Sequence, residues 1–530
     1  MSSRRWWDRA ERLGGVLPAR RLTATDGEWQ QCAADVAAAG GCLLALWSVD
    51  DVSGAGSRVR AAFAIEPGVL IVELAVDRGG AAYPGLESVY PCASRMQRAV
   101  FDLGGLRSTD PDRRPWLRHA AWPAGLHPLR DTRVRAAEGE PVHSGDVDRD
   151  SSGAANGARA DDYAFVRVQG DGVHEIPVGP VHAGIIEPGH FRFSVVGEKV
   201  LRLEERLGYV HKGIERRFGE LGLVDGHRLA ARVSGDSAVA YSWAYCQALE
   251  GLAGCVIPPR AAWLRGLALE VERIANHLGD LGALGNDAGF AFGLAQFSRL
   301  KEHWLRTVSA AFGQRYLLDA VVPGGMGVDV APETARALAA HSSQLAQEVH
   351  ELRRIYEEHD GVRDRFAAAG CVAPELAARL GLIGLAGRAS GHAFDVRVDW
   401  PCAPYDQLLP SVALRTQGDV AARVAVRFDE LAESCRLVAR IAGGLPGGAF
   451  RLEVVAPAAP SFGVGVVEGW RGPVLVALDA GPGGRVLRCH PHDPSWQNWP
   501  GLEHAIIGNI VPDFPLINKS FNLSYSGHDL

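Results

Sequence analysis

Five long segments in the second half of the chain constrain its fold most strongly. In each of them apolar residues recur three and four positions apart, with Glu, Arg and Gln between them. This spacing places the apolar side chains along one face of an α-helix, and that face must be buried against other elements. The segments span residues 226–252, 260–284, 290–312, 332–358 and 418–442. The pattern therefore predicts a bundle of packed helices.

Short apolar runs indicate small sheets beside this bundle. Residues 163–168 and 175–177 have the length and composition of a strand pair, and 474–478 and 485–488 those of a hairpin. Earlier in the chain, 42–47 and 69–74 are apolar runs of strand length, and 26–39 has helical spacing. These earlier runs predict a small α+β unit ahead of the helical part.

A stretch of small polar residues separates the two parts. Residues 135–162 contain no Phe, Tyr or Trp, and such a segment cannot bury enough apolar surface to offset the entropy lost on ordering it. We therefore predict a flexible linker at 135–162 between an N-terminal domain, 1–134, and a second domain, 163–530. The predicted fold class is α+β: a small α+β domain tethered to a mainly helical bundle domain with small flanking sheets.

Charge and hydropathy limit the classes of partner and location. The formal net charge is −7, which gives no support for a nucleic-acid partner. No stretch approaches the roughly 18 uninterrupted apolar residues of a membrane span. The N-terminus also lacks the apolar core of a secretion signal. We expect a cytoplasmic chain whose membrane attachment comes through partner subunits.

The cysteines do not form the pairs that metal sites use. There are 9 of them, and no two are spaced as Cys-x-x-Cys. Iron–sulfur clusters need closely spaced cysteines, so we expect mainly buried thiols in a reducing compartment. The one ligand-like cluster is Cys489-His490-Pro491-His492-Asp493. A lone cysteine with two histidines lacks a fourth ligand nearby, so we interpret this cluster as part of a loop.

A series of short motifs follows in a set order through the second part. They are Gly179-Pro180-x-His182, Glu187-Pro188-Gly189-His190, Gly208-Tyr209-Val210-His211-Lys212-Gly213, Glu270-x-x-Arg273-x-x-Asn276-His277, Pro323-Gly324-Gly325, Arg388-Ala389-Ser390-Gly391, Gly418-Asp419-x-x-x-Arg423 and Glu468-x-x-Arg471-Gly472. Their succession resembles the 49 kDa subunit of respiratory complex I and the large subunit of membrane-bound (group 4) nickel–iron hydrogenases, which share one fold. The formate hydrogenlyase large subunit is one of these hydrogenases. Residues 98–130 resemble the complex I 30 kDa subunit, and the fusion of two such parts resembles the hydrogenlyase arrangement.

The resemblance draws attention to four positions. In the hydrogenases two Cys-x-x-Cys pairs, one from each end of the domain, hold the nickel–iron centre. The matching positions here are Ser234, Ser237, Ser524 and Gly527. A serine hydroxyl stays protonated at neutral pH and is a hard, weak ligand for nickel. The chain is therefore expected to lack a nickel–iron centre, and its sequence identifies no other cofactor that it would hold itself.

The resemblance also implies that the same cavity holds a quinone headgroup in complex I. His190 and Tyr245 match the side chains that hydrogen-bond the quinone carbonyls, and Asp287 matches the carboxylate that supports the histidine. A histidine paired with a carboxylate can hold and deliver a proton near neutral pH, and a phenol is a fixed donor. Further candidates for cofactor contact are His182, Arg273 and Arg471. The alternative is that His190 and Tyr245 maintain the fold, that His182 is a turn residue and that Arg273 belongs to an internal ion-pair network.

Three functions are compatible with these observations. The leading hypothesis is an electron-transfer subunit of a membrane-associated complex resembling complex I and formate hydrogenlyase, with quinone or another small acceptor in the former metal cavity. The second is a non-catalytic structural or coupling subunit, and the third is a true nickel–iron hydrogenase with unusual ligands. The resemblance implies two kinds of partner, an iron–sulfur small subunit similar to the complex I 20 kDa subunit and antiporter-like membrane subunits. It places the chain on the cytoplasmic face of the membrane, with any NAD or formate chemistry on other chains.

Overall fold

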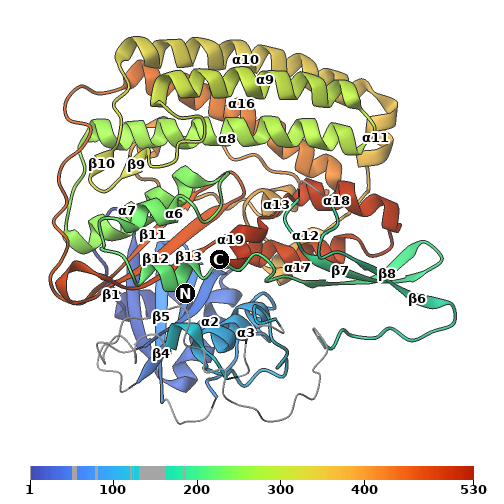
Figure 1. Cartoon of the computed structure of the whole chain (residues 1–530), viewed down its shortest axis with the longest axis horizontal. Helices are drawn as coiled ribbons and strands as arrows, with labels where there is room; N and C mark the ends of the chain where they lie inside the picture. The colour runs from blue at the N-terminus through green and yellow to red at the C-terminus, as the bar shows by residue number, and fades with distance from the viewer. Residues whose placement is uncertain are drawn as a thin grey trace, which may run out of the picture.

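The molecule is built of stacked layers of sheets and helices (Figure 1). The computed structural model describes residues 2–50, 56–77, 82–119, 122, 125–130, 163–183 and 186–530. The predicted linker at 135–162 lies outside these residues and stays a prediction. The order of the layers follows from which faces are apolar, because every apolar sheet face and helix stripe must be covered by a neighbour.

The N-terminal part is a five-stranded sheet covered by helices. Its strands run in the order β1 (Glu11–Arg12), β2 (Ala19–Ala24), β5 (Gly68–Val76), β4 (Ser57–Ile65) and β3 (Cys42–Asp50). The helices are α1 (Ser2–Arg9), α2 (Asp26–Ala38) and α3 (Ala93–Gly104). β3 reads as a continuous apolar run because both faces of the sheet are buried. The predicted α+β unit is present, with the helix and both strands at the expected places.

The second face of this sheet packs against another sheet, not against solvent. Leu44, Ala45 and Trp47 of β3 share one apolar cluster with Val464 and Leu475. Those residues belong to a sheet of β11 (Ser461–Glu468), β12 (Pro473–Ala480) and β13 (Val486–His492). The predicted hairpin is thus confirmed as β12 and β13, with β11 added at one edge. The two parts of the chain are docked through a common core.

Long helices form the layers beyond this second sheet (Figure 1). The helix α7 (Ala238–Ala253) lies on β11 and β12, and α8 (Pro259–Asp287), α9 (Ala291–Phe312), α10 (Pro332–Glu358) and α16 (Val420–Gly444) form the bundle above it. Four of the five predicted helices match these bounds closely. The fifth prediction was wrong in one respect, because 226–252 is divided into α6 (Gly226–Ala230) and α7. Serine and aspartate at 234–237 bond their own neighbourhood and so compete with helical hydrogen bonds.

A third small sheet contains β6 (Val173–Val178), β7 (His190–Val196) and β8 (Lys199–Arg206). The prediction of a strand at 163–168 was wrong, because β6 pairs with β7 and residues 163–168 have no strand structure. Instead, Tyr163 accepts a 2.7 Å hydrogen bond from Arg98. Side-chain anchoring to the N-terminal part replaces strand pairing there.

The remaining α-helices and strands are short and connect these layers. They are α5 (Ile214–Phe218), β9 (Val321–Val322), β10 (Gly325–Met326), α11 (Asp360–Phe366), α12 (Pro374–Leu380), α13 (Gly384–Ala389), α14 (Val396–Asp399), α15 (Tyr405–Leu408), α17 (Ser495–Ala505), α18 (Phe514–Phe521) and α19 (Tyr525–Asp529). Among the described residues, no helix has the combination of length and apolar composition that crossing a membrane requires.

Candidate functional site

The four positions that match the hydrogenase cysteines come from two ends of the second domain. Ser234 and Ser237 lie in the turn between α6 and α7, and Ser524 is the N-cap of α19. The hydroxyl oxygens of Ser234 and Ser524 are 2.9 Å apart. The Ser524 hydroxyl also accepts a 2.9 Å bond from the backbone N–H of Gly527, as an N-cap serine does. The structure therefore brings the two degenerate segments together, and a hydrogen bond joins them.

An ion pair lies against these serines. Arg471, in the tight turn between β11 and β12, donates to both carboxylate oxygens of Asp236 at 2.8 and 2.6 Å. Ser234 donates to the same carboxylate at 2.8 Å. Burial alone would raise the pKa of Asp236, but Arg471 lowers it to about 2. Arg471 also donates to the backbone oxygen of Asn522 at 2.5 Å. The predicted cofactor contact Arg471 thus already has a carboxylate partner within the chain.

A second carboxylate closes the other side of the cluster. Asp493 accepts a 2.8 Å hydrogen bond from the hydroxyl of Tyr241 and a 2.9 Å bond from the backbone N–H of Ser495. A Cβ atom added at Gly527 would lie 2.6 Å from a carboxylate oxygen of Asp493. Atoms at that distance overlap, so position 527 has no room for a side chain unless Asp493 moves. We call Ser234, Ser237, Ser524, Gly527, Asp236, Arg471, Asp493 and Tyr241 the serine cluster.

Sequence reasoning missed three members of this cluster, namely Asp236, Tyr241 and Asp493. Asp236 stands directly between the two degenerate positions Ser234 and Ser237, which was a signal that it would lie near them. Asp493 belongs to the ligand-like run at 489–493, for which the sequence predicts a loop. The structure instead places 486–492 in strand β13, so that interpretation was wrong. Alternation along a strand sends successive side chains to opposite faces, which separates Cys489 from its two histidine neighbours.

The three predicted quinone residues lie on separate elements. His190 begins β7, with its Nδ1 3.3 Å from the backbone oxygen of Gly179 and its ring 5.3 Å from that of Phe165. Asp287 is the last residue of α8, where burial raises the pKa of its carboxyl against the opposing effect of Lys519. None of these contacts links the side chain of His190 to that of Asp287.

Tyr245 occupies a different environment, within the buried length of α7. Its hydroxyl donates a 2.8 Å hydrogen bond to the backbone oxygen of Leu223, and its ring stacks on Phe218 at 5.8 Å. Both contacts are those of a packed aromatic residue whose hydroxyl is satisfied. The role of Tyr245 at a quinone stays a prediction.

His182, another predicted cofactor contact, lies beside an aromatic residue that adjoins the serine cluster in the chain. Its ring is 5.4 Å from Phe191 and 6.3 Å from Tyr525, which follows Ser524 in the chain. Burial lowers the pKa of His182, so its ring is neutral at physiological pH. His182 therefore borders the cluster as a neutral donor and acceptor.

Arg273 lies in a buried ion-pair network that joins the bundle to β11. It donates to Glu430 at 2.7 Å and to the backbone oxygen of Gly469 at 2.7 Å. Glu430 also accepts from Arg388 at 2.8 Å, and Arg388 donates to Glu468 at 2.8 Å. Burial would raise the pKa of Glu430, yet Arg388 and Arg273 hold it well below its usual range. These bonds match the ion-pair alternative for Arg273.

The described part of the chain contains no group of three or more His, Cys, Asp and Glu side chains arranged to hold a metal ion. The serine cluster offers two carboxylates, but Arg471 and Tyr241 occupy them. Chemically, the cluster can donate and accept hydrogen bonds and keep two anionic groups beside neutral hydroxyls. Asp493 is buried, whereas the side chain of Asp236 is 36% exposed.

Comparison with known proteins decides the family. Residues 287–463 match the model of the respiratory-chain NADH dehydrogenase 49 kDa subunit. Subunit 5 of formate hydrogenlyase from Escherichia coli K12 is 31% identical over 464 residues, which cover 87% of this chain and 79% of that one. The carbon monoxide-induced hydrogenase of Rhodospirillum rubrum is 31% identical, covering 66% of this chain and 97% of that one. The chain belongs to the family of hydrogenase and complex I large subunits.

Membership in this family extends beyond the second domain. The 464 residues aligned with formate hydrogenlyase subunit 5 are more than the second domain alone contains, so the alignment reaches into the N-terminal part. A chain of the archaeal membrane-bound sulfane sulfur reductase has a similar fold, with a TM-score of 0.63 and 23% identity, covering 68% of this chain and 98% of that one. The resemblance inferred from the motif order is confirmed.

Proposed function

We propose that this chain is the large, electron-transfer subunit of a membrane-associated oxidoreductase complex similar to formate hydrogenlyase and complex I, and that it works without a nickel–iron centre. One observation carries the second part of the proposal: the Ser234 and Ser524 hydroxyls bond each other at 2.9 Å where the family's metal would be held. Named relatives support the first part, since they include formate hydrogenlyase subunit 5 and a carbon monoxide-induced hydrogenase.

The donors at the serine cluster do not fit a nickel–iron centre. Nickel favours soft thiolate ligands, and a hydroxyl is a hard donor that keeps its proton. The fourth position is Gly527, where an added Cβ would meet Asp493 at 2.6 Å. No hydrogen chemistry at a metal is therefore assigned to this chain.

Partners follow from the family. We propose an iron–sulfur small subunit similar to the complex I 20 kDa subunit as the electron donor to this chain, and antiporter-like subunits as its attachment to the cytoplasmic face of the membrane. The proposal is supported by the fold shared with a chain of an archaeal respiratory membrane complex. Co-purification of a cluster-bearing subunit with the tagged chain tests it.

Restoring the four cysteines should not restore nickel. We expect the purified chain to contain no stoichiometric nickel, and the variant with Ser234→Cys, Ser237→Cys, Ser524→Cys and Gly527→Cys to contain none either, because the fourth thiol has no room beside Asp493. Elemental analysis after expression in a host that matures nickel–iron hydrogenases measures both. Stoichiometric nickel in the native chain would overturn the proposal and favour a hydrogenase with unusual ligands.

A pair of glycine variants checks the steric argument separately. Gly527→Ala should lower the free energy of unfolding by about 1–3 kcal/mol, the usual cost of overpacking. Gly235→Ala is the matched control, since nothing lies within 4 Å of a Cβ added there, and it should change stability by less than about 0.5 kcal/mol. Equal effects in urea unfolding would contradict the steric argument.

Within this proposal, quinone is the candidate electron acceptor. The match of residues 287–463 to the complex I 49 kDa model supports it. Reducing a quinone to quinol takes up two electrons, here supplied by the partner's cluster, and two protons. In this proposal His190 delivers one proton and solvent water supplies the other. Tyr245 would have to turn its hydroxyl from the oxygen of Leu223 to a quinone carbonyl, to which it donates a hydrogen bond while keeping its own proton.

Two variants separate this role from a purely structural one. We expect Tyr245→Phe and His190→Ala each to lower quinone reduction by the assembled complex at least about a hundredfold, the lower end of the usual contribution of a positioned proton donor. Tyr316→Phe, at an exposed tyrosine, is the control and should leave turnover unchanged. Unchanged turnover in both test variants, with assembly intact on native gels, would contradict the quinone proposal and favour a non-catalytic coupling subunit.

A further inference from the structure

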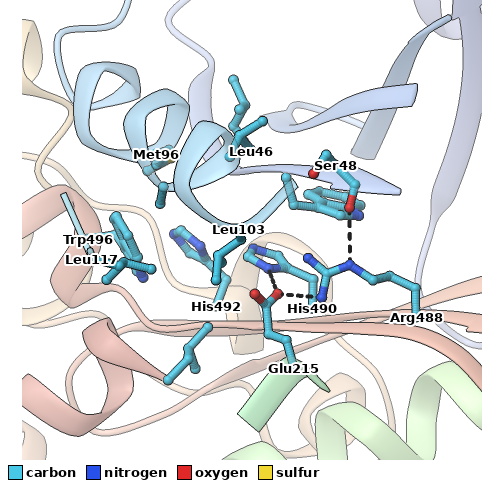
Figure 2. Close-up of a pocket in the computed structure, with 14 residues that line it drawn as sticks. Leu46, Ser48, Met96, Leu103, Leu117, Glu215, Arg488, His490, His492 and Trp496 are labelled. Carbon is cyan, nitrogen blue, oxygen red and sulfur yellow. Dashed lines mark hydrogen bonds and ion pairs between the residues drawn. The ribbon is translucent and has the colours of Figure 1, made fainter. Parts of the chain in front are cut away.

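A small cavity lies where the N-terminal part covers β13 (Figure 2). Leu46 of β3 and Met96 and Leu103 of α3 line one side, and His490 and His492 of β13 line the other. The space open to the centre of a water molecule is about 20 Å³, which is enough for one water. The cavity lies outside the serine cluster and between the two domains.

The first histidine presents a lone pair to this cavity. The Nδ1 atom of His490 lies 2.6 Å from the carboxylate of Glu215, which also pairs with Arg488 at 2.8 Å (Figure 2). Burial would raise the pKa of Glu215, but Arg488 and His490 lower it to about 2, so the carboxylate is ionised and accepts. His490 Nδ1 therefore carries the hydrogen. Because burial lowers the pKa of His490, the ring is neutral and its Nε2 is an acceptor.

His492, the second histidine, also presents an acceptor nitrogen to the cavity, and its partner on the other side of the ring is Gln497. The amide nitrogen of Gln497 donates to the backbone oxygens of Leu43 and Leu44 at 3.1 and 2.6 Å. The same nitrogen lies 3.2 Å from His492 Nε2, and the amide oxygen lies 3.4 Å from it. Because the two backbone oxygens take both amide hydrogens, we assign the hydrogen of His492 to Nε2, which donates to the amide oxygen. Burial holds the pKa of His492 well below its usual value. Its Nδ1 is consequently an acceptor as well.

Both acceptor nitrogens lack a donor. His490 Nε2 and His492 Nδ1 are buried and have no hydrogen-bond partner among the described residues. The two ring centroids are 5.6 Å apart. A buried acceptor without a donor is costly, and water commonly supplies the missing bond. Two acceptors facing one small space match the two hydrogens of a single water molecule.

We propose that this cavity binds one water molecule that donates a hydrogen bond to His490 Nε2 and another to His492 Nδ1, and so joins the two imidazoles into one proton-sharing unit. Because each ring is held on its far side by Glu215 or Gln497, a proton received by one ring can pass through the water to the other. The unit exists only when the N-terminal part is docked, since Leu46, Met96 and Leu103 close the cavity. The site is independent of the function proposed for the serine cluster.

The surroundings favour water over a metal ion. Trp47 stacks on His490 at 5.2 Å and Trp496 on His492 at 5.9 Å. The charged and titratable groups that face the unit are Glu215, Arg488 and His528, which stacks on the far side of Trp496 at 3.9 Å and bonds Asp529 at 2.8 Å. None of these offers a third free ligand, and two imidazoles alone fall short of the four ligands of a structural metal site.

Histidine-selective ¹⁵N NMR of the full chain tests the tautomers. At pH 7.5 we expect two neutral rings, with the hydrogen on Nδ1 in His490 and on Nε2 in His492, assigned by loss of each signal in His490→Gln and His492→Gln. A high-resolution structure should show one water about 2.6–3.2 Å from both acceptor nitrogens. Reversed tautomers, an empty cavity, or stoichiometric zinc or copper in elemental analysis would overturn the proposal.

A cavity-filling variant tests the link between the rings without removing either. Leu103→Phe should expel the water, so the signals of both His490 and His492 should shift, while that of the exposed His350 stays. A shift at only one ring would overturn the shared water. If His490→Gln fails to fold, Leu103→Phe and His492→Gln still decide the outcome, because His492→Gln should move the His490 signal although the two rings share no direct bond.

Discussion

Glu430→Gln should lower the free energy of unfolding by about 3–5 kcal/mol, the usual loss when one partner of a buried ion pair is removed. Glu430 accepts from Arg273 at 2.7 Å and from Arg388 at 2.8 Å, and both arginines are fully buried. Without this carboxylate, Arg273 keeps only a 3.7 Å contact to Glu270 and backbone oxygens. Arg388 keeps Glu468 at 2.8 Å, so Arg273 is the buried guanidinium that is left without a close carboxylate in a low-dielectric interior. Urea unfolding of native and variant chains measures the loss.

Glu348→Gln is the matched control for this prediction. Glu348 pairs with Arg299 between α9 and α10 at 2.6 Å, but both side chains are more than a third exposed. An exposed pair contributes less than about 1 kcal/mol. A loss of the same size in both variants would show that the buried network is not what stabilises the bundle.

Arg60→Met should be comparably destabilising and should also loosen the N-terminal domain. Arg60 of β4 donates to both carboxylate oxygens of Asp479 in β12 at 2.8 and 2.9 Å, and to Glu73 of β5 at 3.1 Å. Its side chain is only 2% exposed. The substitution leaves two buried carboxylates without a cation, which costs about 3–5 kcal/mol. We expect the N-terminal part to become sensitive to limited proteolysis at urea concentrations where the native chain resists.

Two further variants sharpen this second prediction. Arg21→Met removes an exposed pair with Glu11 on the same sheet, and should cost less than about 1 kcal/mol. Adding Asp479→Leu to Arg60→Met removes one of the two orphaned carboxylates, and should recover part of the loss. If the double variant is no more stable than Arg60→Met, the cost does not arise from an unpaired charge.

Much of the helical architecture was predictable because its signal is local. Spacing of apolar residues placed α8, α9, α10 and α16 correctly, since a helix buries one stripe whatever its neighbours are. The same reasoning failed at 231–237, where one apolar pattern continues across a turn. It also failed at 163–168, where Tyr163 bonds Arg98 instead of a neighbouring strand. Both errors arise where a side-chain contact overrides the periodicity.

The candidate site was predictable only in part. The four degenerate positions follow from the motif order, and they do meet. The side chains that bond these positions could not be predicted from the motif order. Asp236 and Arg471 are 235 residues apart in the chain, and nothing in their spacing indicates a pair. The same holds for the water cavity, whose walls come from strands β3 and β13 of different domains.

By itself, the sequence determined the α+β class, the helical bundle, the family and the absence of thiolates at the four former ligand positions. These properties depend on residue type and on short-range periodicity, which act locally. Only the tertiary structure decided that the serines bond each other, that Arg471 is neutralised by Asp236, and that His490 and His492 face one cavity. Those contacts depend on the packing of sheets and helices from distant parts of the chain, and a buried polar group is satisfied by whichever donor or acceptor that packing brings to it.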